Sequence, residues 1–141
     1  MIFEVTPDDI ADLNDEDLRS LIGRLTEQEA LKHNNSCAGV TYGGHQKAAD
    51  GGIDVRAVIE ETQDKSYIPR QNSGYQVKAE DMARAAILAE MRPNGELRPA
   101  ITELAGEGGA YVIVSSHGSV SDSSLKKRRA AMREALSDLP T

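Results

Sequence analysis

Two short stretches of the chain decide which fold to expect: Ile53–Ile59, with the sequence IDVRAVI, and Tyr75–Ala79, with the sequence YQVKA. Both are rich in β-branched or aromatic residues, and their polar residues stand at alternate positions, which is typical of half-buried strands. Successive side chains of a strand point to opposite faces of a sheet, so the apolar members of each stretch can face a core. Asp54, Gln76 and Lys78 then point to the other side. If the two strands are neighbours, these three polar side chains converge.

The residues before these stretches predict a helix and a further strand. Apolar residues recur at helical spacing and indicate one amphipathic helix that ends at about residue 33; they are Leu18, Leu21, Ile22 and Leu25. Asp12 or Asn14 can cap its start, because short polar side chains accept hydrogen bonds from the first free N–H groups of a helix. Residues 37–42 (CAGVTY) indicate a strand, which could form a hairpin with residues 53–59 across the glycine-rich turn at 43–52.

The second half of the chain predicts two helices, a strand and a final helix. In order, these are Met82–Met91, Arg98–Ala105, Ala110–Ser115 and a helix through about Leu136. The first of these helices starts at Glu80 or Asp81, and the last is capped by Asp122 or Ser123. Ala110–Ser115 is a continuous apolar run, which indicates a strand covered on both faces. The order α-β-β-β-α-(α)-β-α predicts an α/β fold in which helices flank a mixed β-sheet.

Length and composition indicate a single globular domain. The chain has 141 residues, of which 39% are hydrophobic, 28% charged and only 4% aromatic, so the core must be built from aliphatic residues and alanine. We expect one domain over residues 1–141, with an acidic lead-in at 1–14. The single cysteine excludes a disulfide framework and a cysteine-rich zinc knuckle, and Cys37 is expected in the core. No apolar run is long enough to span a membrane, so we expect a cytoplasmic protein.

The net charge of −7 is unevenly distributed. Residues 1–31 contain nine acidic residues and two arginines, which accounts for the whole of the −7, and the remainder is neutral. Within that neutral part, Lys126, Lys127, Arg128 and Arg129 form a basic cluster. An acidic chain is a poor match for a nucleic-acid backbone, but this distribution leaves a nucleic-acid partner open.

Of Glu27 and Glu29, near the end of the expected first helix, only Glu29 lies on the apolar stripe. It lies four residues beyond Leu25, whereas Glu27 lies roughly on the opposite side of the helix. A carboxylate on a buried stripe needs a partner. A metal ion held by Asp54 and Glu29 beside Lys78 would supply one.

These residues resemble the motif of the PD-(D/E)XK nuclease superfamily. Gly52-Ile53-Asp54 followed by Gln76-Val77-Lys78 is similar to its Mrr-like branch, in which Gln often replaces the acidic residue before X-Lys. The resemblance covers about residues 15–137. More narrowly, the chain resembles the N-terminal nuclease domain of large bacterial antiphage STAND ATPases of the Mrr-STAND, AVAST type. The stretches that carry this likeness are residues 49–56 (ADGGIDVR), 74–78 (GYQVK) and 109–116 (GAYVIVSS).

The resemblance implies a restriction-endonuclease-like fold and an Mg²⁺-dependent endonuclease, with Mn²⁺ as a possible substitute. The implied substrate is double-stranded DNA, and the implied role is that of an antiviral effector at the N-terminus of a larger STAND-like protein whose activity needs oligomerisation. Asp54, Glu29 and the main-chain carbonyl of Val77 would hold the ion. Lys78 would orient or help to deprotonate the attacking water and offset charge in the transition state. Gln76 can offer a carbonyl oxygen but no charge.

Other functions remain open at this point. The domain could be a nuclease-fold module that no longer cuts and binds nucleic acid or a partner protein, an alternative that the neutral Gln76 keeps open. It could also cleave RNA, because the phosphate chemistry is shared. The basic cluster, Lys126 to Arg129, could grip phosphates or form a solvated helix face. Ser116 and His117, at the end of a strand, could touch nucleic acid or simply make a turn.

Overall fold

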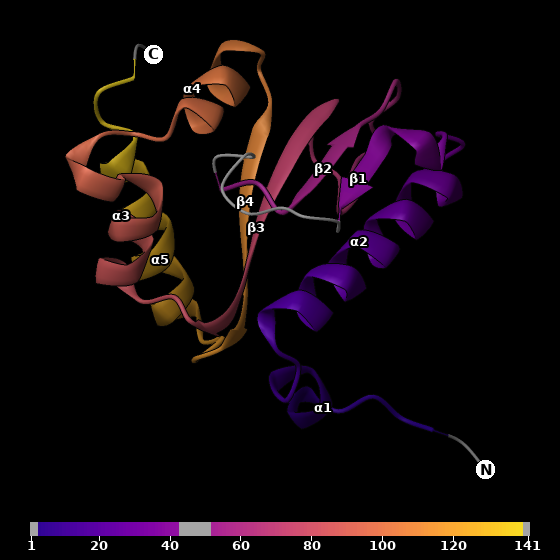
Figure 1. Cartoon of the computed structure of the whole chain (residues 1–141), viewed down its shortest axis with the longest axis horizontal. Coiled ribbons are helices and arrows are strands. Elements are labelled where there is room, and N and C mark those ends of the chain that lie inside the picture. Colours follow the sequence, from indigo (N-terminus) through magenta and orange to yellow (C-terminus); the bar gives the residue numbers. More distant parts are fainter. Residues whose placement is uncertain (1–2, 43–51, 140–141) are drawn as a thin grey trace.

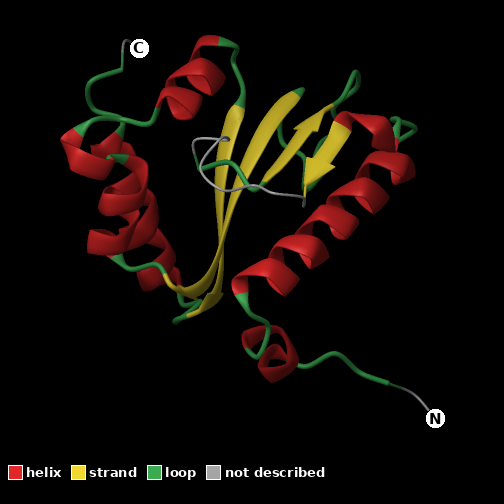
Figure 2. Ribbon diagram, viewed as in Figure 1, coloured by secondary structure: helices red, strands yellow, loops and turns green. Residues whose placement is uncertain are grey.

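The computed structural model describes residues 3–42 and 52–139. They form three layers, in which helix α2 (Asp15–Lys32) covers one face of a four-stranded sheet and the helices of the second half cover the other (Figures 1 and 2). Those helices are α3 (Arg84–Met91), α4 (Pro99–Gly106) and α5 (Asp122–Ala135). The predicted α/β class is confirmed, and so is the predicted order of elements from Asp15 onwards.

The sheet is mixed, with strand order β1-β2-β3-β4. The strands are β1 (Val40–Tyr42), β2 (Val55–Val58), β3 (Asn72–Asp81) and β4 (Ala110–His117). β1, β2 and β3 pair antiparallel, which confirms the hairpin, and β3 and β4 pair parallel. β3 is therefore paired on both sides, and it is twice as long as its apolar stretch predicts.

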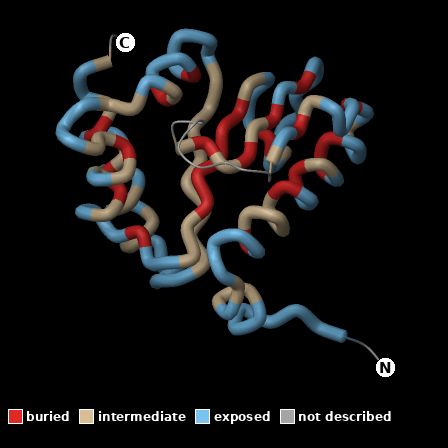
Figure 3. Tube along the Cα trace, in the orientation of Figure 1, coloured by how far each residue is buried: buried red, intermediate tan, exposed pale blue. Residues whose placement is uncertain are grey.

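Alternation along the strands separates two cores. On the α2 face, Val55, Tyr75 and Val77 pack against helix residues such as Leu18 and Ala30. On the opposite face, a second cluster gathers residues of α3, α4 and α5 together with Met82, which lies between β3 and α3. Its other buried members are Ile87, Met91, Ile101, Ala131 and Ala135. Figure 3 shows the buried residues on the sheet and on the inward sides of the helices. The even-numbered side chains Gln76 and Lys78 therefore belong to the face covered by α3.

One of the two expected N-caps of α2 is confirmed, and a further short helix precedes it. Asn14 is the N-cap of α2, and its side chain accepts a hydrogen bond from the main-chain N–H of Asp17. A short helix, α1 (Pro7–Ala11), precedes it within the acidic lead-in and was not predicted. Leu25 is 55% exposed, so the apolar stripe of α2 is narrower than its spacing indicated.

Several expected boundaries are wrong. Glu80 and Asp81 do not start a helix but belong to β3, because parallel pairing with β4 continues as far as Asp81 and His117. The N-cap of α5 is Ser121, and neither Asp122 nor Ser123 as expected. Cys37 is exposed in a 3₁₀ turn (Cys37–Gly39), because the strand that follows starts only at Val40.

The expected turn at 43–52 lies outside the described residues except for Gly52. Among residues 3–42 and 52–139, no helix is both long enough and apolar enough to cross a bilayer.

Candidate functional site

Asp54 lies where the hairpin of β2 and β3 opens. The regular pairing ends at Val55 and Tyr75, and the main-chain N–H of Asp54 donates to the carbonyl of Tyr75 at 2.8 Å. Two residues further along β3, the main-chain N–H of Val77 donates to the Asp54 carboxylate oxygen Oδ2 at 2.8 Å. A side chain thus replaces the main-chain acceptor. In a strand the N–H and C=O of one residue point the same way, so the Val77 carbonyl also faces this opening.

The surroundings of Asp54 only partly compensate its charge. Burial raises the pKa of Asp54, and the hydrogen bond from Val77 and the positive charges of Arg19 and Lys78 oppose that rise without cancelling it. Arg19, on α2, places Nη1 3.6 Å from Oδ1. A further cation beside Asp54 would therefore stabilise the ionised form of this partly buried carboxylate.

Lys78 is tied to the neighbouring helix by an ion pair. Its Nζ lies 3.2 Å from Oε2 of Glu90, in the last turn of α3. The other oxygen of that carboxylate, Oε1, lies 3.1 Å from Nη2 of Arg98, and Arg98 Nε also donates to the main-chain carbonyl of Glu90 at 2.6 Å. We call Arg19, Asp54, Lys78, Glu90 and Arg98 the charge cluster. It contains three cations and two carboxylates.

Two buried polar groups on the same face of the sheet have no hydrogen-bond partner within the described part of the chain. One is Oε1 of Gln76, a residue that is only 4% exposed. The other is the hydroxyl of Tyr111 on β4, whose pKa is raised by burial and by the negative charges of Glu90 and Asp54. Most buried polar groups in proteins are paired, so each of these is a place for a water molecule or an ion.

The oxygen atoms around Asp54 suit a hard divalent cation. The Asp54 carboxylate, the amide oxygen of Gln76 and the carbonyl of Val77 come from adjoining segments of the sheet. They are ligand types that Mg²⁺ accepts, with water completing the shell. Only the first carries charge. Among the described residues, no group of three or more His, Cys, Asp or Glu side chains could hold a metal ion.

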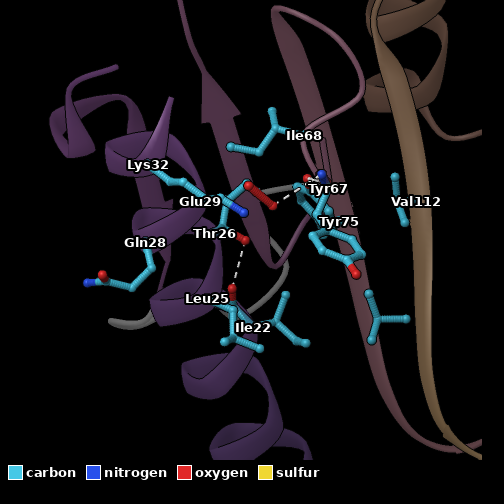
Figure 4. Close-up of a pocket in the computed structure, with 11 residues that line it drawn as sticks. Ile22, Leu25, Thr26, Gln28, Glu29, Lys32, Tyr67, Ile68, Tyr75 and Val112 are labelled. Atoms are coloured by element: carbon cyan, nitrogen blue, oxygen red, sulfur yellow. Dashed lines mark hydrogen bonds between the residues drawn. The ribbon is translucent and has the colours of Figure 1, made fainter. Parts of the chain in front are cut away.

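Glu29 is not brought to this site. Its Oε1 lies 2.9 Å from Nε2 of His33, and its Oε2 accepts the N–H of Tyr67 at 3.3 Å. It lines an open, mainly apolar pocket of about 580 Å³ between α2 and strands β3 and β4 (Figure 4). Ten residues separate it from Arg19, which is roughly 15 Å along a helix. The expected rotation of the helix is confirmed, since Glu29 is buried, but its expected position beside Asp54 is wrong.

Glu27, the comparison residue on the same helix, is also engaged elsewhere. Its carboxylate accepts a hydrogen bond from the Tyr42 hydroxyl, which raises the pKa of Tyr42.

The expected nucleic-acid contacts are only partly accessible. Lys126, Lys127 and Arg129 are exposed on α5. Arg128 instead donates to the main-chain carbonyl of Ser119 at 2.7 Å and to Asp81 at 3.2 Å, so it connects α5 to the end of β3. His117 is exposed, whereas the Ser116 hydroxyl is buried without a partner in the described chain. The basic cluster is therefore three exposed cations and one structural arginine.

Four residues of the site were missed from the sequence: Arg19, Glu90, Arg98 and Tyr111. Glu90 had a usable signal, because it lies three residues after the buried Ile87 and so shares the inward face of α3. That is the same argument that singled out Glu29. Arg98 had none, because its approach depends on the path of the chain between α3 and α4.

No family model matches this sequence, and neither the curated proteins nor the solved structures contain a significant match to it.

Proposed function

We propose that this chain is an Mg²⁺-dependent endonuclease domain with a restriction-endonuclease-like fold, acting on duplex DNA. The observation that carries the proposal is the Asp54 carboxylate, which is held by the N–H of Val77 where β2 and β3 part, with Lys78 on the adjoining strand. A carboxylate that could hold Mg²⁺ and a lysine on the adjoining strand could together supply an activated water and stabilise charge during phosphodiester hydrolysis. The role in antiviral defence as part of a larger STAND-like protein is proposed from the sequence resemblance.

The residues divide the work between holding an ion and stabilising charge. Asp54, the Gln76 amide oxygen and the Val77 carbonyl would hold Mg²⁺, which when bound acidifies a water molecule and polarises the phosphate. Lys78 offsets the negative charge that accumulates on the phosphate oxygens during attack. Glu90 restrains the Lys78 ammonium group through their 3.2 Å ion pair, so that little reorganisation is needed.

A second candidate function, nucleic-acid binding without cleavage, is favoured by the low negative charge of the candidate metal ligands. Gln76 is neutral, and no group of three acidic or other metal-binding side chains occurs among residues 3–42 and 52–139. A domain of this kind could bind nucleic acid without cutting it. The same fold would then serve as a recognition module.

Cleavage assays with matched lysine variants separate these candidates. Supercoiled plasmid and a structured RNA are incubated with the wild type, Lys78→Met and Lys32→Met, each in Mg²⁺ and in EDTA; Lys32 is an exposed lysine near the end of α2, outside the charge cluster. We expect DNA cleavage by the wild type and Lys32→Met in Mg²⁺ only, and none by Lys78→Met. If only the RNA is cleaved, the substrate is RNA and not DNA. If neither is cleaved but the protein shifts the nucleic acid in a gel, the domain is a recognition module. Equal cleavage by folded Lys78→Met would falsify the assignment.

A further inference from the structure

Arg98 folds back across the end of α3 and is held there by Glu90. Its Nε and Nη2 contact the main-chain carbonyl and the carboxylate of that residue, at 2.6 and 3.1 Å. In the described part of the chain, its Nη1 makes no hydrogen bond, and the side chain is 25% exposed. A guanidinium has five N–H donors in a fixed plane, so Arg98 keeps donors for a ligand after satisfying Glu90.

Arg98 and Lys78 share one carboxylate. Each binds a different oxygen of Glu90, so a guanidinium and an ammonium group stand close together at the wall of the site. The charge cluster then has three positive and two negative groups, and one positive charge is left over before any metal ion is counted. A phosphodiester, with one negative charge, would neutralise it.

Arg98 also borders the turn that leads into Asp54. Gly52 has φ +92°, and a Cβ placed on it would come within 2.8 Å of Cδ and Nε of Arg98. The turn therefore requires glycine both for its conformation and for the approach of this side chain. The stem of Arg98 thus packs against the segment that positions the metal-binding carboxylate.

We infer that Arg98 binds a phosphate group of the nucleic-acid backbone beside Asp54, and that Glu90 is a positioning residue that holds Arg98 and Lys78 for this contact. The inference rests on the proposed function and extends it, because it moves the principal phosphate contact from α5 to the segment between α3 and α4. The planar guanidinium can donate two hydrogen bonds to two phosphate oxygens, which a lysine cannot reproduce.

The test measures binding in the absence of cleavage. A labelled DNA duplex is titrated with the full chain by fluorescence anisotropy in EDTA and in Ca²⁺, over a series of salt concentrations. The variants are Arg98→Ala, Arg98→Gln and Arg98→Lys. Arg84→Ala is the matched control, because Arg84 lies on α3 and makes an exposed ion pair with Glu134. Melting curves establish which variants are folded, and Arg98→Gln substitutes for Arg98→Ala if the latter does not fold.

We expect the neutral Arg98 variants to lower the log-log salt dependence of binding by close to one unit. Arg98→Lys should keep the slope and lose affinity severalfold, because it retains the charge but not the paired donors. Arg84→Ala should leave both unchanged. Glu90→Gln is added to the same titration and to the plasmid cleavage assay in Mg²⁺. It removes a negative charge, so it should bind DNA at least as tightly as the wild type while cutting it more slowly. A merely structural role for Glu90 would lower both together.

The outcomes distinguish the inference from the proposed function. If the wild type binds DNA and the folded neutral Arg98 variants keep its salt slope, the inference is wrong and the nuclease proposal stands. A wild type that neither binds nor cleaves nucleic acid overturns both.

Discussion

The carboxylate of Asp15 accepts a hydrogen bond from the main-chain N–H of Ala79 at 2.7 Å, which fastens the start of α2 to β3 directly after Lys78. From this point the helix runs back along the strand in the opposite direction. Its first turns therefore lie at the opening of the hairpin, where Arg19 reaches Asp54. Its last turns lie at the other end of β3, where Glu29 reaches Tyr67.

Glu29 should therefore matter for stability and not for cleavage. Glu29→Ala removes the acceptor of the Tyr67 N–H and the partner of His33, so we expect a loss of about 1–3 kcal/mol in the free energy of unfolding, measured in urea. The folded variant should cleave DNA at the wild-type rate. Loss of cleavage with unchanged stability would contradict this and support the role of metal ligand that the sequence predicted for Glu29.

Asp54→Asn should stabilise the protein at neutral pH while abolishing metal binding. Burial raises the pKa of Asp54, so in a window above the ordinary pKa of aspartate the folded protein holds a proton that the unfolded chain has released. Within that window, stability falls as the pH rises. The melting temperature of Asp54→Asn should exceed that of the wild type by a margin that grows from acidic to neutral pH and then levels off. A margin independent of pH would contradict this account of Asp54.

Gln76→Glu should exchange stability for metal affinity. The amide oxygen of Gln76 is buried without a partner in the described chain, so a carboxylate there would be poorly solvated and should lower the melting temperature in EDTA. Because this variant adds a charged ligand beside Asp54, Mg²⁺ should restore more stability to it than to the wild type. Melting curves over a series of Mg²⁺ concentrations measure both effects. Equal Mg²⁺ responses would place Gln76 outside the ion's reach.

Arg128 and its neighbour Arg129 should differ in their effect on folding. Arg128→Ala removes the hydrogen bond to the Ser119 carbonyl and the ion pair with Asp81, and should cost about 1 kcal/mol, measured by urea unfolding. Arg129 is exposed, so Arg129→Ala should change stability by less than about 0.5 kcal/mol. If the two variants are equally stable, Arg128 does not connect α5 to β3.

Double-strand cleavage should depend on protein concentration. One such site attacks one strand, and a break in both strands needs two sites, most simply from a symmetric pair of domains. The net charge of −7 makes isolated domains repel each other, so dilute protein should nick plasmid slowly. Linear product should rise steeply with concentration or forced dimerisation, scored on gels beside light scattering. Rapid linearisation by a demonstrated monomer would refute this.

Strand alternation was the most informative feature of the sequence. A period of two residues is strict, so it correctly separated Tyr75 and Val77 from Gln76 and Lys78, and it placed Asp54 near them. It did not predict the length of β3, because Asn72, Gly74 and Asp81 are poor strand formers. Pairing holds them in the sheet: Asn72 pairs with β2, Asp81 with β4, and Gly74 with both.

Helical periodicity was less complete. It gives the rotation of a helix about its axis, and so it correctly buried Glu29. It says nothing about how far the helix is displaced along the sheet, which the contact between Asp15 and Ala79 decides. Contacts such as that of Arg98 with Glu90 depend on where a connecting segment turns, and no local pattern in the sequence records that.

The carboxylate of Asp54 in place of a main-chain acceptor has an evolutionary consequence. The residue on which the proposed chemistry depends is also one whose charge the fold holds at a cost, since burial raises its pKa. A mutation that replaces Asp54 with a neutral residue of similar size would avoid this cost and raise the free energy of unfolding. Descendants that have lost catalysis and kept the architecture should accordingly be easy to reach, and only selection for cutting would retain the acid.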